Sequence, residues 1–278
     1  MAFKDILVHV DSTARCPARV DAAIALAAAH GAHLTGLYVL TYPRIPGYVR
    51  GQISEDILRH QAEAIVGAAA VAEQQFNDAV ARAGINGEWR LVEGDAVPVL
   101  SLHGRYADVV VVGQRDPAGE EGSFDPTMPD QLILALGRPV LAVPFVGDYP
   151  VVGRRVMVAW DAGRAATRAV NDALPLLVEA KRVVVMAVNP KGGEEGHGEI
   201  PSADICLHLA RHGVKAEAAH VYADDIAVGD MLLSRAADDG IDLIVTGCYG
   251  HARWRELVLG GVTRHLLAHM TMPVLMSH

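Results

Sequence analysis

The hexapeptide ILVHVD at residues 6–11 returns 150 positions later as VMVAWD at residues 156–161, and this repeat decides the fold. Each copy is a short run of apolar residues that ends in an aspartate. A second match lies near the end of each half, where ADVVVVG at residues 107–113 corresponds to IDLIVTG at residues 241–247. Self-similarity of this kind is the sequence signature of a repeated structural unit.

The spacing of a further pair of segments supports the repeat. RPVL at residues 138–141 corresponds to MPVL at residues 272–275, with the same offset of 134 residues as the pair that ends in glycine. The interval from glycine to proline is therefore 26 residues in each half. We infer a tandem duplication and predict a first domain at 1–147 and a second domain at 151–278.

Apolar runs alternate with helical stretches in each half. The runs are continuous in Val, Ile and Leu, which is typical of parallel strands that are covered on both faces. Strands that alternate with helices predict an α/β fold, here two tandem, doubly wound, parallel, five-stranded sheets of Rossmann-like type. The expected strands are 6–10, 34–40, 88–92, 108–112 and 139–143 in the first half, and 156–160, 183–188, 215–221, 242–246 and 273–276 in the second.

The ends of these strands are the places where we expect a ligand. In doubly wound sheets, ligands bind beyond the carboxyl ends of the strands, at the point where the strand order reverses. A long helix expected at 54–84 has a different role, because its apolar stripe is expected to pack in the core. The strand-end residues are Asp11, Val39, Gly113, Asp161, Val188 and Gly247, and the stripe is Ala62, Ile65, Val66, Ala69 and Ala70.

The composition excludes several classes of protein. Hydrophobic residues make up 51% of the chain and charged residues 21%, so each half can bury a core. The net charge of −9 argues against a protein that binds nucleic acid by neutralising phosphates. Asp5 and Asp11 interrupt the N-terminal apolar run, and no stretch approaches 18 uncharged apolar residues. We therefore expect no membrane span and a cytoplasmic protein.

A glycine-rich loop follows the strand 242–246. Its glycines have the spacing G-x2-G-x9-G-G and lead into a helix expected at 261–270. Glycine lets the backbone approach a ligand closely, and a helix N-terminus offers unpaired N–H groups to a phosphate. The loop therefore fits a phosphate site, although the same glycines would also serve a plain turn and a helix start. Cys248 lies inside the loop and is expected to be an inert, small residue.

On these residues the chain resembles the universal stress protein family in its tandem, two-domain form. The resemblance rests on Asp11 and Asp161, on the glycine loop, and on the segment Pro273-Val274-Leu275. It implies the fold of nucleotide-binding alpha hydrolases. It also implies a pseudo-dimer in which the last strand of the first half, 140–144, pairs with that of the second, 274–277. A homodimer of such chains is left open.

The resemblance further implies an adenine nucleotide, ATP with or without Mg²⁺, in the second domain only. The family's aspartate after the first strand contacts the adenosine moiety, and the backbone after the second strand holds the adenine edge. The glycine loop lines the ribose and the phosphates. In this sequence the implied residues are Asp161, Val188, Thr246, Gly247, Gly250, Gly260, Gly261, Val262 and Thr263.

One position departs from the family pattern. The family has Ser or Thr after the third glycine of the loop, and this chain has Gly261. A lost neutral hydrogen bond costs about 0.5–1.5 kcal/mol, roughly tenfold in affinity. We expect Thr263 to supply a nearby hydroxyl, so that ATP binding is weakened and not lost.

The first half departs from the pattern much further. At the offset of 134 residues, Asp116, Pro126 and Thr127 replace the second, third and fourth glycines, and the same loop carries Glu120, Glu121 and Asp125. Negative charge repels a phosphate, and proline removes a backbone donor. We predict that this loop does not bind ATP.

Three functions are compatible with the sequence. The one we favour is a nucleotide-binding protein with a role in stress response or regulation and with little ATP hydrolysis. The alternative is a binding or interaction module whose apolar cavities hold a lipid-like or other small ligand. An enzyme is the least supported, because no nucleophile or general base can be placed.

Overall fold

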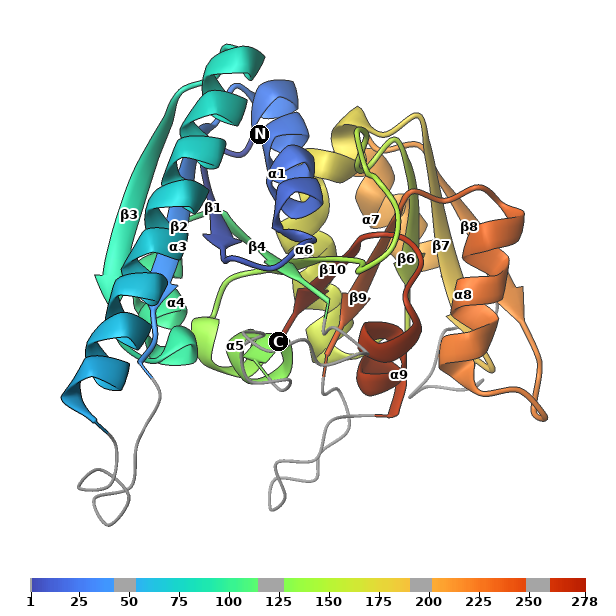
Figure 1. Ribbon diagram of the computed structural model, residues 1–278. Coiled ribbons are helices and arrows are strands. Elements are labelled where there is room, and N and C mark those ends of the chain that lie inside the picture. Colours follow the sequence, from blue (N-terminus) through green and yellow to red (C-terminus); the bar gives the residue numbers. More distant parts are fainter. Residues whose placement is uncertain (1, 43–53, 115–127, 191–201, 249–260) are drawn as a thin grey trace.

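The computed structural model describes residues 2–42, 54–114, 128–190, 202–248 and 261–278. Within these ranges ten strands lie in one sheet, with helices on both of its faces (Figure 1). The strands are β1 (Asp5–Val10), β2 (His33–Leu40), β3 (Gly87–Glu93), β4 (Val109–Gly113), β5 (Val140–Val143), β6 (Arg155–Ala159), β7 (Arg182–Val188), β8 (Ala216–Val221), β9 (Leu243–Gly247) and β10 (Val274–Ser277). The helices are α1 (Cys16–His30), α3 (Glu55–Ala83), α4 (Ala96–Gly104), α5 (Met128–Leu136), α6 (Arg164–Glu179), α7 (Ala203–Arg211), α8 (Val228–Asp238) and α9 (Gly261–His269).

The order of the strands repeats the duplication of the sequence. It runs β3-β2-β1-β4-β5-β10-β9-β6-β7-β8. Each half is a five-stranded parallel unit in which the order reverses between its first and fourth strands. The last strands, β5 and β10, pair antiparallel, with Leu141 opposite Leu275. The two predicted parallel sheets and their pairing through the last strands are confirmed, and the pairing makes them one continuous sheet.

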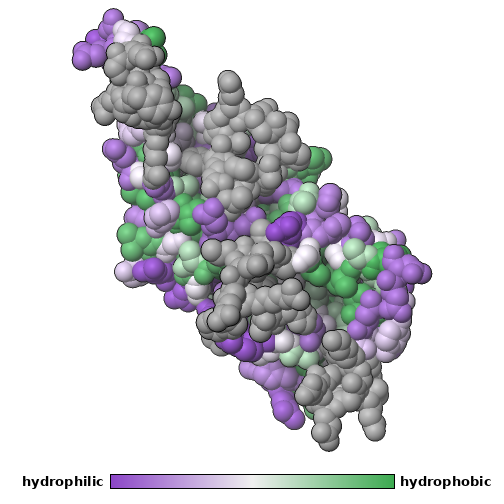
Figure 2. Space-filling model, turned by 90° about the horizontal axis from the view of Figure 1, so that it is seen from below, coloured by the Kyte–Doolittle hydropathy of each residue, from purple (hydrophilic) through white to green (hydrophobic). Residues whose placement is uncertain are grey.

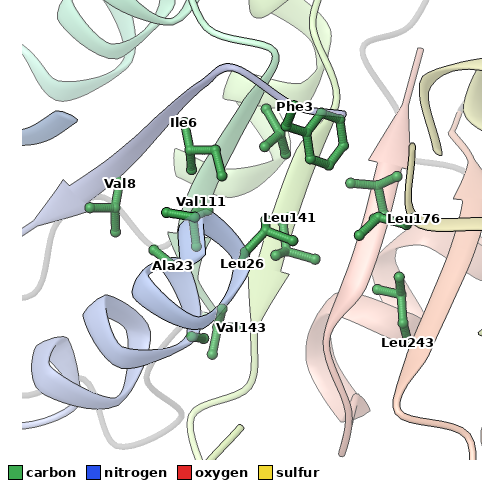
Figure 3. Packing of buried hydrophobic residues seen from close by; sticks show 14 of the residues in the cluster. Phe3, Ile6, Val8, Ala23, Leu26, Val111, Leu141, Val143, Leu176 and Leu243 are labelled. Carbon is green, nitrogen blue, oxygen red and sulfur yellow. The ribbon is translucent and has the colours of Figure 1, made fainter. Parts of the chain in front are cut away.

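Each face of this sheet carries one layer of buried side chains. One layer draws its helical residues from α1, α3, α6 and α7, and the other from α4, α5, α8 and α9. Both layers contain residues of both halves. Figure 3 shows Phe3 and Leu141 of the first half in the same cluster as Leu176 and Leu243 of the second. The hydrophobic core is therefore continuous across the junction.

Polar contacts also cross the junction between the halves. The side-chain amide of Gln114, just after β4, donates to the carbonyl oxygens of Leu267 and Ala268 near the end of α9, at 3.0 Å each. Arg168 of α6 donates to the carbonyl oxygen of Gly137, after α5, at 2.6 Å. Both contacts satisfy carbonyl groups at a helix end that have no partner within the helix.

The long helix α3 differs from its expected packing. Of the predicted stripe only Ala69 is buried, and Val66 is 48% exposed. The core contacts come instead from the second half of the helix, where Ala72, Phe76 and Val80 are buried. The first turns of α3 run past the sheet (Figure 1), so their apolar side chains have no sheet to cover, whereas the half-buried Ile65 of the stripe still packs against the core. Neither α3 nor any other helix in the described ranges could cross a membrane.

Candidate functional site

The carboxyl ends of β6 and β9 bring Asp161 and Gly247 to the point where the strand order of the second half reverses. Ala159 pairs with Thr246 across these two strands, and Asp161 follows two residues later. The Asp161 carboxylate is exposed, and its Oδ1 accepts a hydrogen bond from the backbone N–H of Gly163 at 2.8 Å. This bond shapes the turn that begins α6. Oδ2 has no partner among the described residues, so it is available to a ligand.

Gly247 has a packing role of its own. A Cβ at this position would lie 2.2 Å from the backbone nitrogen of Ala166 and 2.3 Å from the carbonyl carbon of Ala165. The first turn of α6 therefore rests directly on the end of β9, and only glycine permits this approach. Thr246, the preceding residue, is buried and donates its hydroxyl to the Gly247 carbonyl oxygen at 3.1 Å.

Val188 ends β7, and its surroundings are held by a residue that the sequence analysis did not single out. Asn189 has a left-handed backbone, with φ of 49°. Its side-chain amide accepts from Ala223 N at 2.7 Å and donates to Ala223 O at 3.2 Å. The amide thus extends the pairing of β7 with β8 beyond the strands and fixes the backbone next to Val188. An asparagine directly after a strand is the available signal, because asparagine tolerates this backbone conformation.

The start of α9 places Gly261 and Thr263 differently. Gly261 is exposed, and a Cβ there would meet no atom of the described residues within 4 Å. Thr263 is only 4% exposed, and its hydroxyl bonds the Cys248 thiol in the core. The expectation that this hydroxyl replaces the missing family Ser or Thr is therefore not supported, because the hydroxyl points away from the surface. Val262 is half-buried, and Gly250 and Gly260 lie outside the described residues.

The buried thiol of Cys248 has low reactivity in this structure. Burial raises the pKa of its thiol to about 12, against a smaller opposing effect of the Thr263 hydroxyl. A thiol with such a pKa is protonated at neutral pH and is a poor nucleophile. The interpretation of Cys248 as a small, inert residue agrees with this environment.

The first half has no equivalent of the exposed Asp161. Asp11 takes the same place after β1 but is only 6% exposed. Its Oδ1 accepts from the Thr13 backbone N–H at 3.0 Å and from the Thr13 hydroxyl at 2.6 Å. Its Oδ2 lies 2.8 Å from the guanidinium of Arg19. Both carboxylate oxygens of Asp11 are therefore bound within the protein. The predicted loop differences at Asp116, Pro126 and Thr127 lie outside the described residues.

Comparison with known proteins settles the family. The model of the universal stress protein family matches residues 2–144 and again residues 153–278. The chain belongs to the universal stress protein family. The two matches confirm the tandem arrangement, while the domain limits 1–147 and 151–278 stay predictions.

Individual universal stress proteins show how far the similarity extends. Universal stress protein Slr1230 of Synechocystis sp. is 24% identical over 173 residues, which is 60% of this chain and 57% of that protein. The crystal structure of a universal stress protein from Archaeoglobus fulgidus DSM 4304 has the same fold, with 16% identity, a TM-score of 0.75, and coverage of 98% of this chain and 95% of its own. A universal stress protein solved in complex with cAMP matches 50% of this chain and 95% of its own, with 22% identity and a TM-score of 0.33.

Proposed function

We propose that this tandem universal stress protein binds an adenine nucleotide, ATP with or without Mg²⁺, in its second domain and acts as a nucleotide-responsive regulator. The observation that carries the proposal is the contrast between the two equivalent aspartates. At the reversal point of the strand order, Asp161 has one carboxylate oxygen without a partner among the described residues, whereas Asp11 is bound on both oxygens. The glycine loop follows β9, next to the exposed carboxylate, and its counterpart in the first half has lost three of its four glycines.

The described residues fit the parts of such a nucleotide. A carboxylate with a free oxygen accepts hydrogen bonds from ribose hydroxyls, so Asp161 is suited to the adenosine moiety. The two hydrogen bonds between the Asn189 side chain and the Ala223 backbone hold the backbone next to Val188. Backbone N–H and C=O groups in this position are suited to the edge of the base. The N-terminus of α9 begins at Gly261, meets no other described residue there and carries no acidic residue in its first turn. Unpaired N–H groups at such an end favour a phosphate.

Figure 2 shows the molecule from below the view of Figure 1, the side on which α9 lies in that view. Hydrophilic and hydrophobic residues are interspersed over the visible described surface there. We infer a role in nucleotide binding and regulation. Any hydrolysis of the nucleotide is expected to be slow, because no general base is assigned to this site.

Replacing Asp161 tests the proposal. We expect Asp161→Ala to weaken ATP binding at least tenfold in a calorimetric titration, because it removes a charged acceptor of the ligand's hydrogen bonds. Asp161→Asn keeps an oxygen for the Gly163 N–H and separates the loss of charge from damage to the turn. Asp78→Ala removes an exposed carboxylate from α3 and serves as the matched control, with unchanged affinity expected.

The same titration distinguishes the competing functions. Equal affinity of wild type and Asp161→Ala would contradict the assignment of the site. A wild-type protein that takes up no ATP would favour the alternative module with a lipid-like or other small ligand. Two ATP molecules per chain would contradict the restriction to the second domain.

Gly261→Ser restores the residue type that the family has at this position. We expect about tenfold tighter ATP binding, because serine at the exposed start of α9 adds one hydroxyl beside the phosphate position. Among the described residues nothing lies within 4 Å of the added Cβ, so we expect the fold to tolerate the change. The matched control is Gly67→Ser on α3, where an added Cβ also meets nothing within 4 Å. Unchanged ATP affinity in Gly261→Ser would contradict the assignment of the α9 N-terminus to the phosphate site.

A further inference from the structure

A buried cluster of charged and polar side chains lies at the reversal point of the first half, between β1, β4 and α1. Arg19 reaches into it from α1 and is only 5% exposed. Its Nη2 lies 2.8 Å from Asp11 Oδ2, and its Nε donates to the backbone oxygen of His9 at 2.7 Å. The thiol of Cys16 accepts from the Asp11 backbone N–H at 3.4 Å and completes the cluster.

The guanidinium also covers the end of β4. A Cβ on Gly113 would lie 2.4 Å from Arg19 Nη1. The guanidinium therefore bridges the carboxyl ends of β1 and β4, which are neighbours in the sheet and flank the reversal of the strand order. This is the general place for a ligand in a sheet of this kind. In the first half it is filled by the chain itself.

The second half shows that this filling is not a requirement of the fold. Its register is the same, because Ile6 pairs with Val109 as Val156 pairs with Leu243. At the matching position of α6 stands Ala169, which is buried and carries no charge. There the first turn of α6 lies on Gly247 directly, and the aspartate is exposed. The first half thus has both the arginine and a buried, paired aspartate. The second half has an alanine and an exposed aspartate at the equivalent positions.

We propose that Arg19 is the first domain's built-in ligand: its guanidinium occupies the binding position beside Asp11 and Gly113, and it keeps the first domain closed to small molecules and folded without any. The position is thereby specific for a planar guanidinium group, which donates to a carboxylate and a carbonyl oxygen at once. This proposal does not depend on nucleotide binding by the second domain.

The charges of the cluster support this role. Burial alone would raise the pKa of Asp11, but the Arg19 guanidinium, with His9 and Thr13, outweighs it and holds that pKa well below its usual range. Burial lowers the pKa of His9 to about 4, so the imidazole is neutral at pH 7 and adds no second positive charge. One carboxylate and one guanidinium therefore balance each other in the buried cluster.

Chemical rescue tests the proposal. Arg19→Ala leaves the buried carboxylate without its partner, and we expect the melting temperature to fall by about 10 °C. Methylguanidinium at millimolar concentration is expected to raise the melting temperature of Arg19→Ala by about 4 °C, saturably, by refilling the vacated position. The wild type, whose position is filled, is expected to show no such rise, and NaCl at equal ionic strength controls for a general salt effect.

A second variant keeps the test decisive if Arg19→Ala does not fold. Asp11→Asn/Arg19→Ala removes the buried charge together with its partner, so it is expected to be more stable than Arg19→Ala and insensitive to methylguanidinium. The proposal is overturned if folded Arg19→Ala is not rescued or if NaCl rescues it equally. It is also overturned if the double variant is no more stable than the single one, because Arg19 would then act through packing alone. All of these measurements are made without nucleotide, so their outcome does not depend on nucleotide binding by the second domain.

Discussion

Gly247→Ala is expected to lower the free energy of unfolding by about 4 kcal/mol or more, because the added methyl group collides with backbone. The Cβ would lie 2.2 Å from Ala166 N and 2.3 Å from the carbonyl carbon of Ala165. Neither atom can rotate away, so α6 must lift from the end of β9. Both alanines are buried, and the shift would expose the packed first turn of the helix. Urea unfolding followed by circular dichroism measures the loss.

A glycine without neighbours provides the matched control. Gly67→Ala adds the same methyl group on α3, where nothing lies within 4 Å, and alanine is the better helix former. A slight gain in stability is expected there. Unfolding of Gly247→Ala at the wild-type urea concentration would contradict the close contact with α6. If the large loss is found, weakened nucleotide binding in any Gly247 variant has a structural explanation and says little about direct ligand contact.

Leu275→Pro is expected to abolish cooperative folding of both halves. Leu275 lies in β10, which is paired on one side with Leu141 of β5 and on the other with Val245 of β9. Proline removes a backbone donor from the interior of the sheet and also deletes a fully buried side chain. An unpaired buried group costs about 1–3 kcal/mol and a lost leucine about 2–5 kcal/mol. Together these losses are comparable to the whole stability of a typical domain.

The fluorescence of Trp89, measured with Trp160 and Trp254 replaced by phenylalanine, reports whether the damage crosses the junction. Trp89 belongs to β3 of the first half and packs against Tyr38 and Phe76, at ring-centroid distances of 5.9 and 5.7 Å. Because sheet and core are continuous, we expect Trp89 to become exposed in Leu275→Pro although the substitution lies in the second half. Leu275→Met, which nearly conserves volume, is the control and should melt close to wild type. A native Trp89 signal in Leu275→Pro would show that the halves fold independently.

The sequence predicted the fold well because its signals are local and occur twice. Strands such as β1 and β6 are continuous apolar runs, and their repetition, with the common offset of 134 residues between two later pairs of segments, identified the two parallel units. The antiparallel pairing of β5 with β10 came from the resemblance to a family, since an apolar run contains no information about which distant strand will lie beside it. The exposed first half of α3 was mispredicted because helical periodicity does not tell where the sheet beneath a helix ends.

The site was predictable in outline but not in its details. Asp161 and Gly247 followed from their place at strand ends, whereas the role of Arg19 was missed because arginine in a helix is usually exposed. The comparison of Arg19 with Ala169 in the other half was the available signal. Thr263 was assigned to the phosphate, yet it shares the spacing of the buried Leu266, Leu267 and Met270, which places it on the inner stripe of α9. The side chain of Thr263 packs in the core because its side of α9 faces inward.

The fusion of the two halves through β5 and β10 also changes how the two binding positions can evolve. In a homodimer of separate identical chains, every substitution appears in both copies at once, so a site cannot be lost from one copy and kept in the other. Here each copy has its own codons, and the covalent link ensures that unlike copies always meet in equal number at high effective concentration. One copy can therefore carry an internal ion pair at this position while its neighbour carries an exposed carboxylate.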